Sequence, residues 1–146
     1  MVTLFDEINK EKTKIAAEEV LMQYRKLKMI SKREIQKRMI NTYNRSSSDE
    51  ESDITERKVS AKIYAEEETE RIERAVESIP NEKQRMVIEE RYLKGFEKYD
   101  SECSFNLDMP TSSYSNYKAA GLIAVAWALG CEEYWNTSRV IIEYSL

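Results

Sequence analysis

Residues 81–130 contain three helix-forming segments separated by two breaks, and this pattern constrains the fold more than any other part of the chain. Asn81 can cap a first helix over about 82–93, which ends near a glycine. A second, short helix is expected over about 100–107, followed by a tight connection through 108–110. A third helix then runs to about residue 130. We therefore expect an all-α helical bundle that contains a helix-turn-helix.

Each of the three segments repeats apolar residues at helical spacing, so each is expected to bury one face. Pro110 suits the start of the third helix, because its missing N–H donor would be unpaired there in any case. Thr111 or Ser112 can provide the cap. The residues expected in the core are Val87, Ile88, Tyr92, Cys103, Leu107, Tyr114, Tyr117, Leu122 and Val125.

The third helix begins with a polar fringe opposite its buried aromatic residues. In a helix-turn-helix, the N-terminal residues of the second motif helix meet base edges in the major groove. Asn can pair bidentately with adenine, Ser and Thr accept several bases, and nearby Lys and Arg contact phosphates. The candidate DNA-binding residues are Thr111, Ser112, Ser113, Ser115, Asn116 and Lys118, together with Arg85, Lys94 and Lys98. The same periodicity also fits the alternative of an ordinary three-helix core, in which the polar face of the third helix is exposed to water and binds no DNA.

The chain contains no His, which excludes His-based acid–base chemistry, Ser-His and Cys-His nucleophile pairs and most zinc sites. Carboxylates alone remain for chemistry, and their runs are expected on solvated helix faces. Cys103 and Cys131 are too few and too isolated for a disulfide framework. We therefore expect a protein that is not an enzyme, needs no metal or cofactor, and stays in the cytoplasm without a membrane anchor.

The net charge of −4 hides a strong segregation along the chain. Residues 10–45 carry eleven Lys and Arg against four acids, whereas residues 46–77 carry eleven acids against five bases. Segregation of this kind matters more than the sum for the attraction of phosphates. The basic run is either a phosphate-contacting arm or a solvated helix face.

Four regions are expected along the chain: a basic helical arm over 1–43, a polar linker over 44–53, a helical domain over 54–130, and an apolar tail over 131–146. In the arm, one helix should cover 6–29, and the capping-box pattern Ser31-Lys32-Arg33-Glu34 should restart a helix that continues to Tyr43. In the domain, a long helix should cover 54–79, with an acidic run that is a solvated bridge rather than a metal site. Its core positions are Val59, Ile63, Ile72, Val76 and Ile79.

Residues 81–125 resemble the fourth region of bacterial sigma factors. The likeness rests on a helix ending in the pair Arg91-Tyr92, a short helix, a turn, and a recognition helix that reaches Gly121-Leu122. More narrowly, roughly residues 15–130 are similar to the ArpU-type phage transcriptional regulators of Gram-positive bacteria. The elements that carry this likeness are the runs 20–27, 88–93 and 113–118 around the Ser- and Asp-rich break.

This resemblance implies a sequence-specific regulator that activates phage late genes or lysis genes by binding double-stranded DNA, without enzymatic activity. Carried over by position, the base-reading residues are Thr111, Ser112, Ser115 and Asn116. Sigma factors carry Arg and Glu on this face, whereas here the face is nearly uncharged. One such domain should therefore bind DNA weakly, and the basic arm or dimerisation would have to supply the rest.

The run 119–129 is apolar on every side and is therefore expected to be buried on every side. The tail adds Tyr134, Trp135 and Val140-Ile141-Ile142. Either the arm and the tail fold over the run 119–129, or a second chain covers it. Of these two alternatives we expect the second, a homodimer. The alternative function is a protein-interaction module that binds RNA polymerase or a sigma factor without sequence-specific DNA contact.

Overall fold

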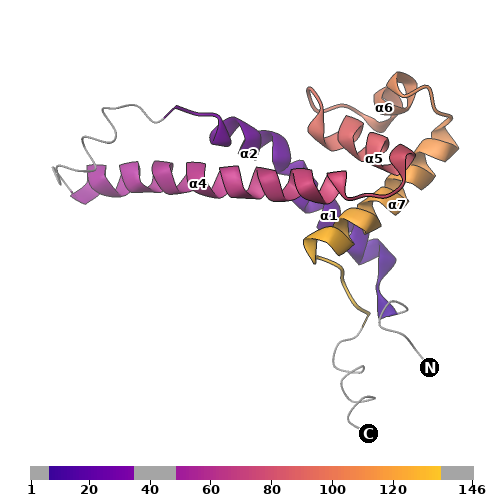
Figure 1. The fold of residues 1–146 in the computed structure, drawn as a ribbon, viewed down its shortest axis with the longest axis horizontal. Helices are drawn as coiled ribbons and strands as arrows, with labels where there is room; N and C mark the ends of the chain where they lie inside the picture. The colour runs from indigo at the N-terminus through magenta and orange to yellow at the C-terminus, as the bar shows by residue number, and fades with distance from the viewer. Residues whose placement is uncertain (1–6, 35–48, 136–146) are drawn as a thin grey trace, which may run out of the picture. The chain divides into compact units, whose positions relative to one another are not determined.

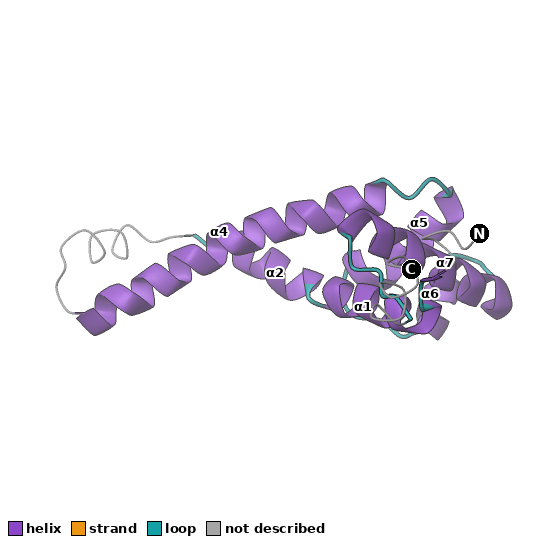
Figure 2. Cartoon of the chain, turned by 90° about the horizontal axis from the view of Figure 1, so that it is seen from below, coloured by secondary structure: helices purple, strands orange, loops and turns teal. Residues whose placement is uncertain are grey.

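The computed structural model describes residues 7–34 and 49–135, and these ranges are largely helical (Figure 1). Figure 2 shows helices joined by loops, with no strand in the described ranges; Ile8 and Tyr134 form an isolated antiparallel bridge. The predicted all-α class is confirmed for this part of the chain. The elements are α1 (Lys10–Met22), α2 (Tyr24–Ser31), α4 (Asp49–Glu77), α5 (Glu82–Ile88), the π-helical turn η2 (Glu89–Leu93), α6 (Asp100–Asn106) and α7 (Thr111–Leu129).

The helices belong to two compact units. One unit comprises residues 1–22 and 74–146, and the other comprises residues 23–73. None of the helices within the described ranges is long and apolar enough to cross a membrane.

The N-terminal arm differs from the single helix expected over residues 6–29. Helix α1 begins at Lys10, because the Asn9 side chain accepts a hydrogen bond from the Lys12 backbone N–H at 3.1 Å and caps the helix. Gln23 interrupts the helix between α1 and α2. Ser31 ends α2, and its hydroxyl donates to the Lys28 carbonyl at 2.7 Å. The expected capping box at Ser31 is therefore wrong, and the helix expected to run on to residue 43 lies outside the described residues from position 35.

In the second unit, one carboxylate joins α2 to α4. The Tyr24 hydroxyl and Lys28 Nζ both donate to Glu73 Oε1, each at 2.7 Å. The bond from Lys28 holds the pKa of Glu73 below its usual value, although partial burial opposes this shift and Tyr24 assists it. Burial and the nearby Glu73 raise the pKa of Tyr24, so its hydroxyl stays a donor.

Helix α4 begins at Asp49, so residues 49–53 are helical and not part of a polar linker. The predicted core positions Ile72, Val76 and Ile79 are buried, and Val59 is half-buried. Ile63 is 52% exposed, so its placement in the core was wrong. The buried side of α4 instead passes through Thr55, Ala65 and Thr69, which apolar periodicity does not identify.

The core of the first unit matches the expectation closely. Asn81 caps α5 by accepting a hydrogen bond from the Gln84 backbone N–H at 3.0 Å. Gly121 of α7 lies against α5, where a Cβ atom would stand 2.7 Å from Ile88 Cγ1 and 3.2 Å from the Gln84 carbonyl oxygen. Leu107 and Tyr117 are half-buried. The expected core residues that are buried are Val87, Ile88, Tyr92, Cys103, Tyr114, Leu122 and Val125.

The C-terminal half of α7 is not buried on every side. Leu122, Val125 and Ala126 are buried, but Ile123 is half-buried and Ala128 is exposed. Helices α1 and α5 both pack against α7, and α6 contacts it as well. The helix ends at Gly130 in the left-handed conformation, with φ of 71°. Most of the apolar tail, residues 136–146, lies outside the described residues.

Candidate nucleic-acid interface

A short turn connects α6 to α7 and sets where the candidate recognition helix begins. Asp108 takes a left-handed conformation with φ of 53°, and the Met109 N–H donates to the Ser104 carbonyl at 2.9 Å. Pro110 occupies the cap position, and no side chain caps the helix. Thr111 is already the first helical residue, so neither Thr111 nor Ser112 is the cap that the sequence suggested.

The first turns of α7 carry a stripe of exposed polar side chains. Thr111, Ser112, Ser115 and Asn116 are exposed, and Ser113 is half-buried. Because these positions follow helical spacing, they form one face, while Tyr114 points to the opposite side and is buried. The structure therefore brings the proposed base-reading residues together on a surface that a ligand can reach.

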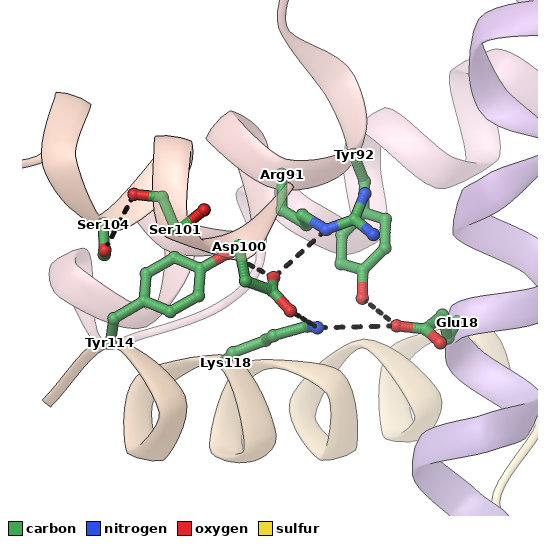
Figure 3. Close-up of polar contacts among 8 residues, drawn as sticks. All are labelled: Glu18, Arg91, Tyr92, Asp100, Ser101, Ser104, Tyr114 and Lys118. Carbon is green, nitrogen blue, oxygen red and sulfur yellow. Dashed lines mark hydrogen bonds and ion pairs between the residues drawn. The ribbon is translucent and has the colours of Figure 1, made fainter. Parts of the chain in front are cut away.

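The carboxylate of Asp100, the first residue of α6, holds three side chains at once (Figure 3). Asp100 Oδ1 accepts a hydrogen bond from the Tyr114 hydroxyl at 2.7 Å and one from Arg91 Nε at 3.1 Å. Asp100 Oδ2 accepts one from Lys118 Nζ at 2.9 Å. Asp100 in α6 thus connects Arg91 of η2 with Tyr114 and Lys118 in the N-terminal half of α7. These contacts orient the polar stripe.

The local electrostatics keep this carboxylate charged. Partial burial alone would raise the pKa of Asp100, but the bonds from Lys118 and Tyr114 and the charges of Lys118 and Arg91 outweigh it and hold the pKa below its usual range. Burial raises the pKa of Tyr114, and the neighbouring Asp100 raises it further. The phenol therefore remains protonated and keeps donating.

Glu18 of α1 contacts the same group of side chains. The Tyr92 hydroxyl donates to Glu18 Oε2, and Lys118 Nζ lies 3.7 Å from that oxygen (Figure 3). Burial raises the pKa of Tyr92, and the bond to Glu18 adds to the shift. Lys118, a candidate phosphate contact, is therefore flanked by two carboxylates. Sequence reasoning missed this contact, because Glu18 lies far from Lys118 along the chain and no local pattern links them.

The other candidate phosphate contacts also lie beside acids. Lys98 Nζ is 2.7 Å from Glu90 Oε1, an interaction that lowers the pKa of Glu90 against the opposing effect of burial. Glu89 lies 3.8 Å from Arg85 Nε and 3.9 Å from Lys94 Nζ. The four nominated cations therefore present little uncompensated positive charge.

An open groove of about 300 Å³ separates the candidate recognition face from α1. Its α7 side includes Ser115, Lys118 and Ala119, and its α1 side includes Glu11 and Glu18. Acidic side chains of the arm thus stand next to the polar stripe. No cluster of three or more potential metal-binding side chains occurs in the described ranges.

Comparisons of the chain with models of protein families, with curated proteins and with solved structures found no match.

Proposed function

We propose that this protein is a sequence-specific DNA-binding transcriptional regulator, in which α6 and α7 form a helix-turn-helix and α7 enters the major groove. The observation that carries the proposal is the exposed stripe of Thr111, Ser112, Ser115 and Asn116 on a helix whose opposite face is buried. Small hydroxyl side chains let a helix approach base edges closely, and Asn can recognise adenine. The network around Asp100 gives this stripe a rigid base.

The resemblance to ArpU-type regulators extends the proposal to a phage-encoded activator of late or lysis genes that acts in the host cytoplasm. The support is the sequence pattern of the Arg91-Tyr92 pair, the short second helix and the Ser- and Tyr-rich start of the third. Since the nominated cations have acidic partners, a single copy should bind DNA weakly. We therefore include a homodimer in the proposal, because two half-sites raise the effective affinity.

Replacement of Asn116 by Ala tests base reading directly. We expect specific binding to weaken by about 1–3 kcal/mol, because one bidentate base contact is lost, while binding to random duplex barely changes. Fluorescence anisotropy with a duplex selected by the wild-type protein and with a random duplex measures both affinities. Gln23→Ala, which removes an exposed amide that caps no helix, serves as the control variant. Equal losses on both duplexes would show that Asn116 does not read bases.

Glu18→Gln tests whether the arm opposes phosphate binding. The variant keeps a hydrogen-bond acceptor for Tyr92 but removes a negative charge 3.7 Å from Lys118. We expect about two- to fivefold tighter binding to any duplex at low salt, the size typical of one partly exposed ion pair. Glu19→Gln removes the same charge from an exposed position of α1 outside the groove. If both variants change the affinity equally, Glu18 has no local effect on Lys118.

One observation favours the second candidate function, a protein-interaction module that binds RNA polymerase or a sigma factor. The acidic partners of Lys98 and Lys118 reduce the charge available for phosphates. The dependence of affinity on salt separates the two functions: DNA affinity should fall steeply between low and physiological salt, whereas binding through an apolar surface should change much less.

A further inference from the structure

Three aromatic side chains within ten residues of the first unit have almost no protein contact. Phe96 is 90% exposed, Tyr99 is 79% exposed and Phe105 is 84% exposed. Phe96 and Tyr99 lie in the loop after η2, and Phe105 lies in α6. Exposed aromatic groups of this kind are costly to hydrate and typically mark partner surfaces.

The three rings are close enough along the chain to meet one partner. Tyr99 precedes α6 and Phe105 lies near its end, so about 9 Å of helix axis separates them at 1.5 Å per residue. Phe96 is three residues before Tyr99, at most about 10 Å along an extended chain. The inner face of α6 buries Cys103 and Ser104, so Phe105 is directed away from the core.

The charge around these rings is acidic. Glu97, Glu102 and Asp108 are exposed, and none of these carboxylates forms an ion pair within the described residues. Lys98, the lysine of this segment, pairs with Glu90 at 2.7 Å, and the preceding Lys94 lies 3.9 Å from Glu89. A partner would therefore meet aromatic rings surrounded by uncompensated negative charge.

We propose that the segment 96–108 is a docking surface for a basic protein segment with apolar anchors, such as an amphipathic Lys- and Arg-rich helix. Aromatic side chains supply most of the binding energy at protein interfaces, and complementary charge steers the partner and sets its orientation. Nucleic acid is disfavoured as the partner of the exposed rings of Phe96 and Phe105, because its phosphates would lie beside Glu97 and Glu102. The inference does not rest on DNA binding by α7.

The test uses the full chain and a fluorescent, synthetic amphipathic peptide of Leu and Lys, with a Leu and Glu peptide of the same pattern for comparison. We expect the wild-type protein to bind the basic peptide, and Phe96→Ser/Phe105→Ser to weaken binding at least about tenfold. Glu97→Gln/Glu102→Gln should weaken it less and flatten its salt dependence. Phe96→Ser alone, at the most exposed of the three rings, should show a partial loss without any change in melting temperature.

The control variant is Ile63→Ser, which removes an exposed apolar side chain on α4 next to Glu66 and Glu67, and it should bind the peptide like the wild type. An equal loss in Ile63→Ser and Phe96→Ser/Phe105→Ser would overturn the proposal. So would tighter binding of the acidic peptide. Loss of single-stranded oligonucleotide binding or of self-association in the Phe variants, without loss of peptide binding, would assign the surface to nucleic acid or to a second copy and would also overturn it.

Discussion

Replacement of Gly121 by Val is expected to lower the free energy of unfolding by about 3 kcal/mol, at the upper end of the cost of overpacking a core. A Cβ atom at position 121 would stand 2.7 Å from Ile88 Cγ1 and 3.0 Å from Ile88 Cδ1, and Ile88 is fully buried. The Gln84 carbonyl oxygen, at 3.2 Å, belongs to the backbone of α5 and cannot rotate away. The two helices would therefore have to separate.

Urea unfolding followed by circular dichroism measures this loss. Ala128→Val adds two methyl groups to the Cβ at an exposed position of α7, and it should cost less than about 1 kcal/mol through helix propensity. If Gly121→Val is no more destabilising than Ala128→Val, then Gly121 does not lie against Ile88 and the Gln84 carbonyl at these distances.

Removal of the Asp100 carboxylate is the second change with a large expected effect. Asp100→Ala leaves the buried Tyr114 hydroxyl without this acceptor and removes one acidic partner from each of Lys118 and Arg91. We expect the free energy of unfolding to fall by about 2 kcal/mol, because the buried Tyr114 hydroxyl is left unsatisfied. Water can reach the site through the half-exposed side of Asp100, which keeps the loss from being larger. Specific DNA binding should weaken as well, since the polar stripe of α7 loses its support.

The loss should depend on pH in a defined direction. The folded protein holds the pKa of Asp100 below its usual value of 3.8, so the charged carboxylate stabilises the fold fully above that unfolded pKa. This contribution disappears as the pH falls through the folded pKa. The difference between wild type and Asp100→Ala should therefore be large at neutral pH and shrink under acid conditions.

Glu102→Ala provides the matched control, because it removes an acid from the same first turn of α6, where negative charge also favours the helix dipole. A loss at neutral pH that is equal in the two variants would mean that Asp100 acts only through the dipole. If the difference in free energy of unfolding between the wild type and Asp100→Ala stays constant down to acid pH, the charge of the Asp100 carboxylate does not stabilise the fold.

The helices that depend on local signals could be predicted from the sequence. Asn81 caps α5, Pro110 precedes α7, and apolar spacing identified Val87, Ile88, Tyr92 and Tyr114 as core residues. Such features depend on residues a few positions apart, so they are visible without knowledge of the tertiary structure.

Features that depend on distant residues could not be predicted. Glu18 lies 74 residues from Tyr92 and 100 residues from Lys118 along the chain, so the sequence pattern gave no sign that α1 contacts either side chain. The π-helical turn at Glu89–Leu93 was not predicted either, because the apolar spacing from Ile88 to Tyr92 also fits an α-helix. Apolar periodicity predicted that Ile63 lies in the core. It is exposed because the side of α4 that packs against other residues passes through Ala65 and Thr69.

Selection from a random pool of double-stranded DNA by the purified full chain shows directly whether α7 reads a base sequence. We expect that a common sequence is enriched at low salt, that Asn116→Ala abolishes or changes this enrichment, and that the bound species contains two protein copies per site. Recovery of the input pool without enrichment, by a folded wild-type protein at low salt, would contradict the proposal that α7 reads DNA.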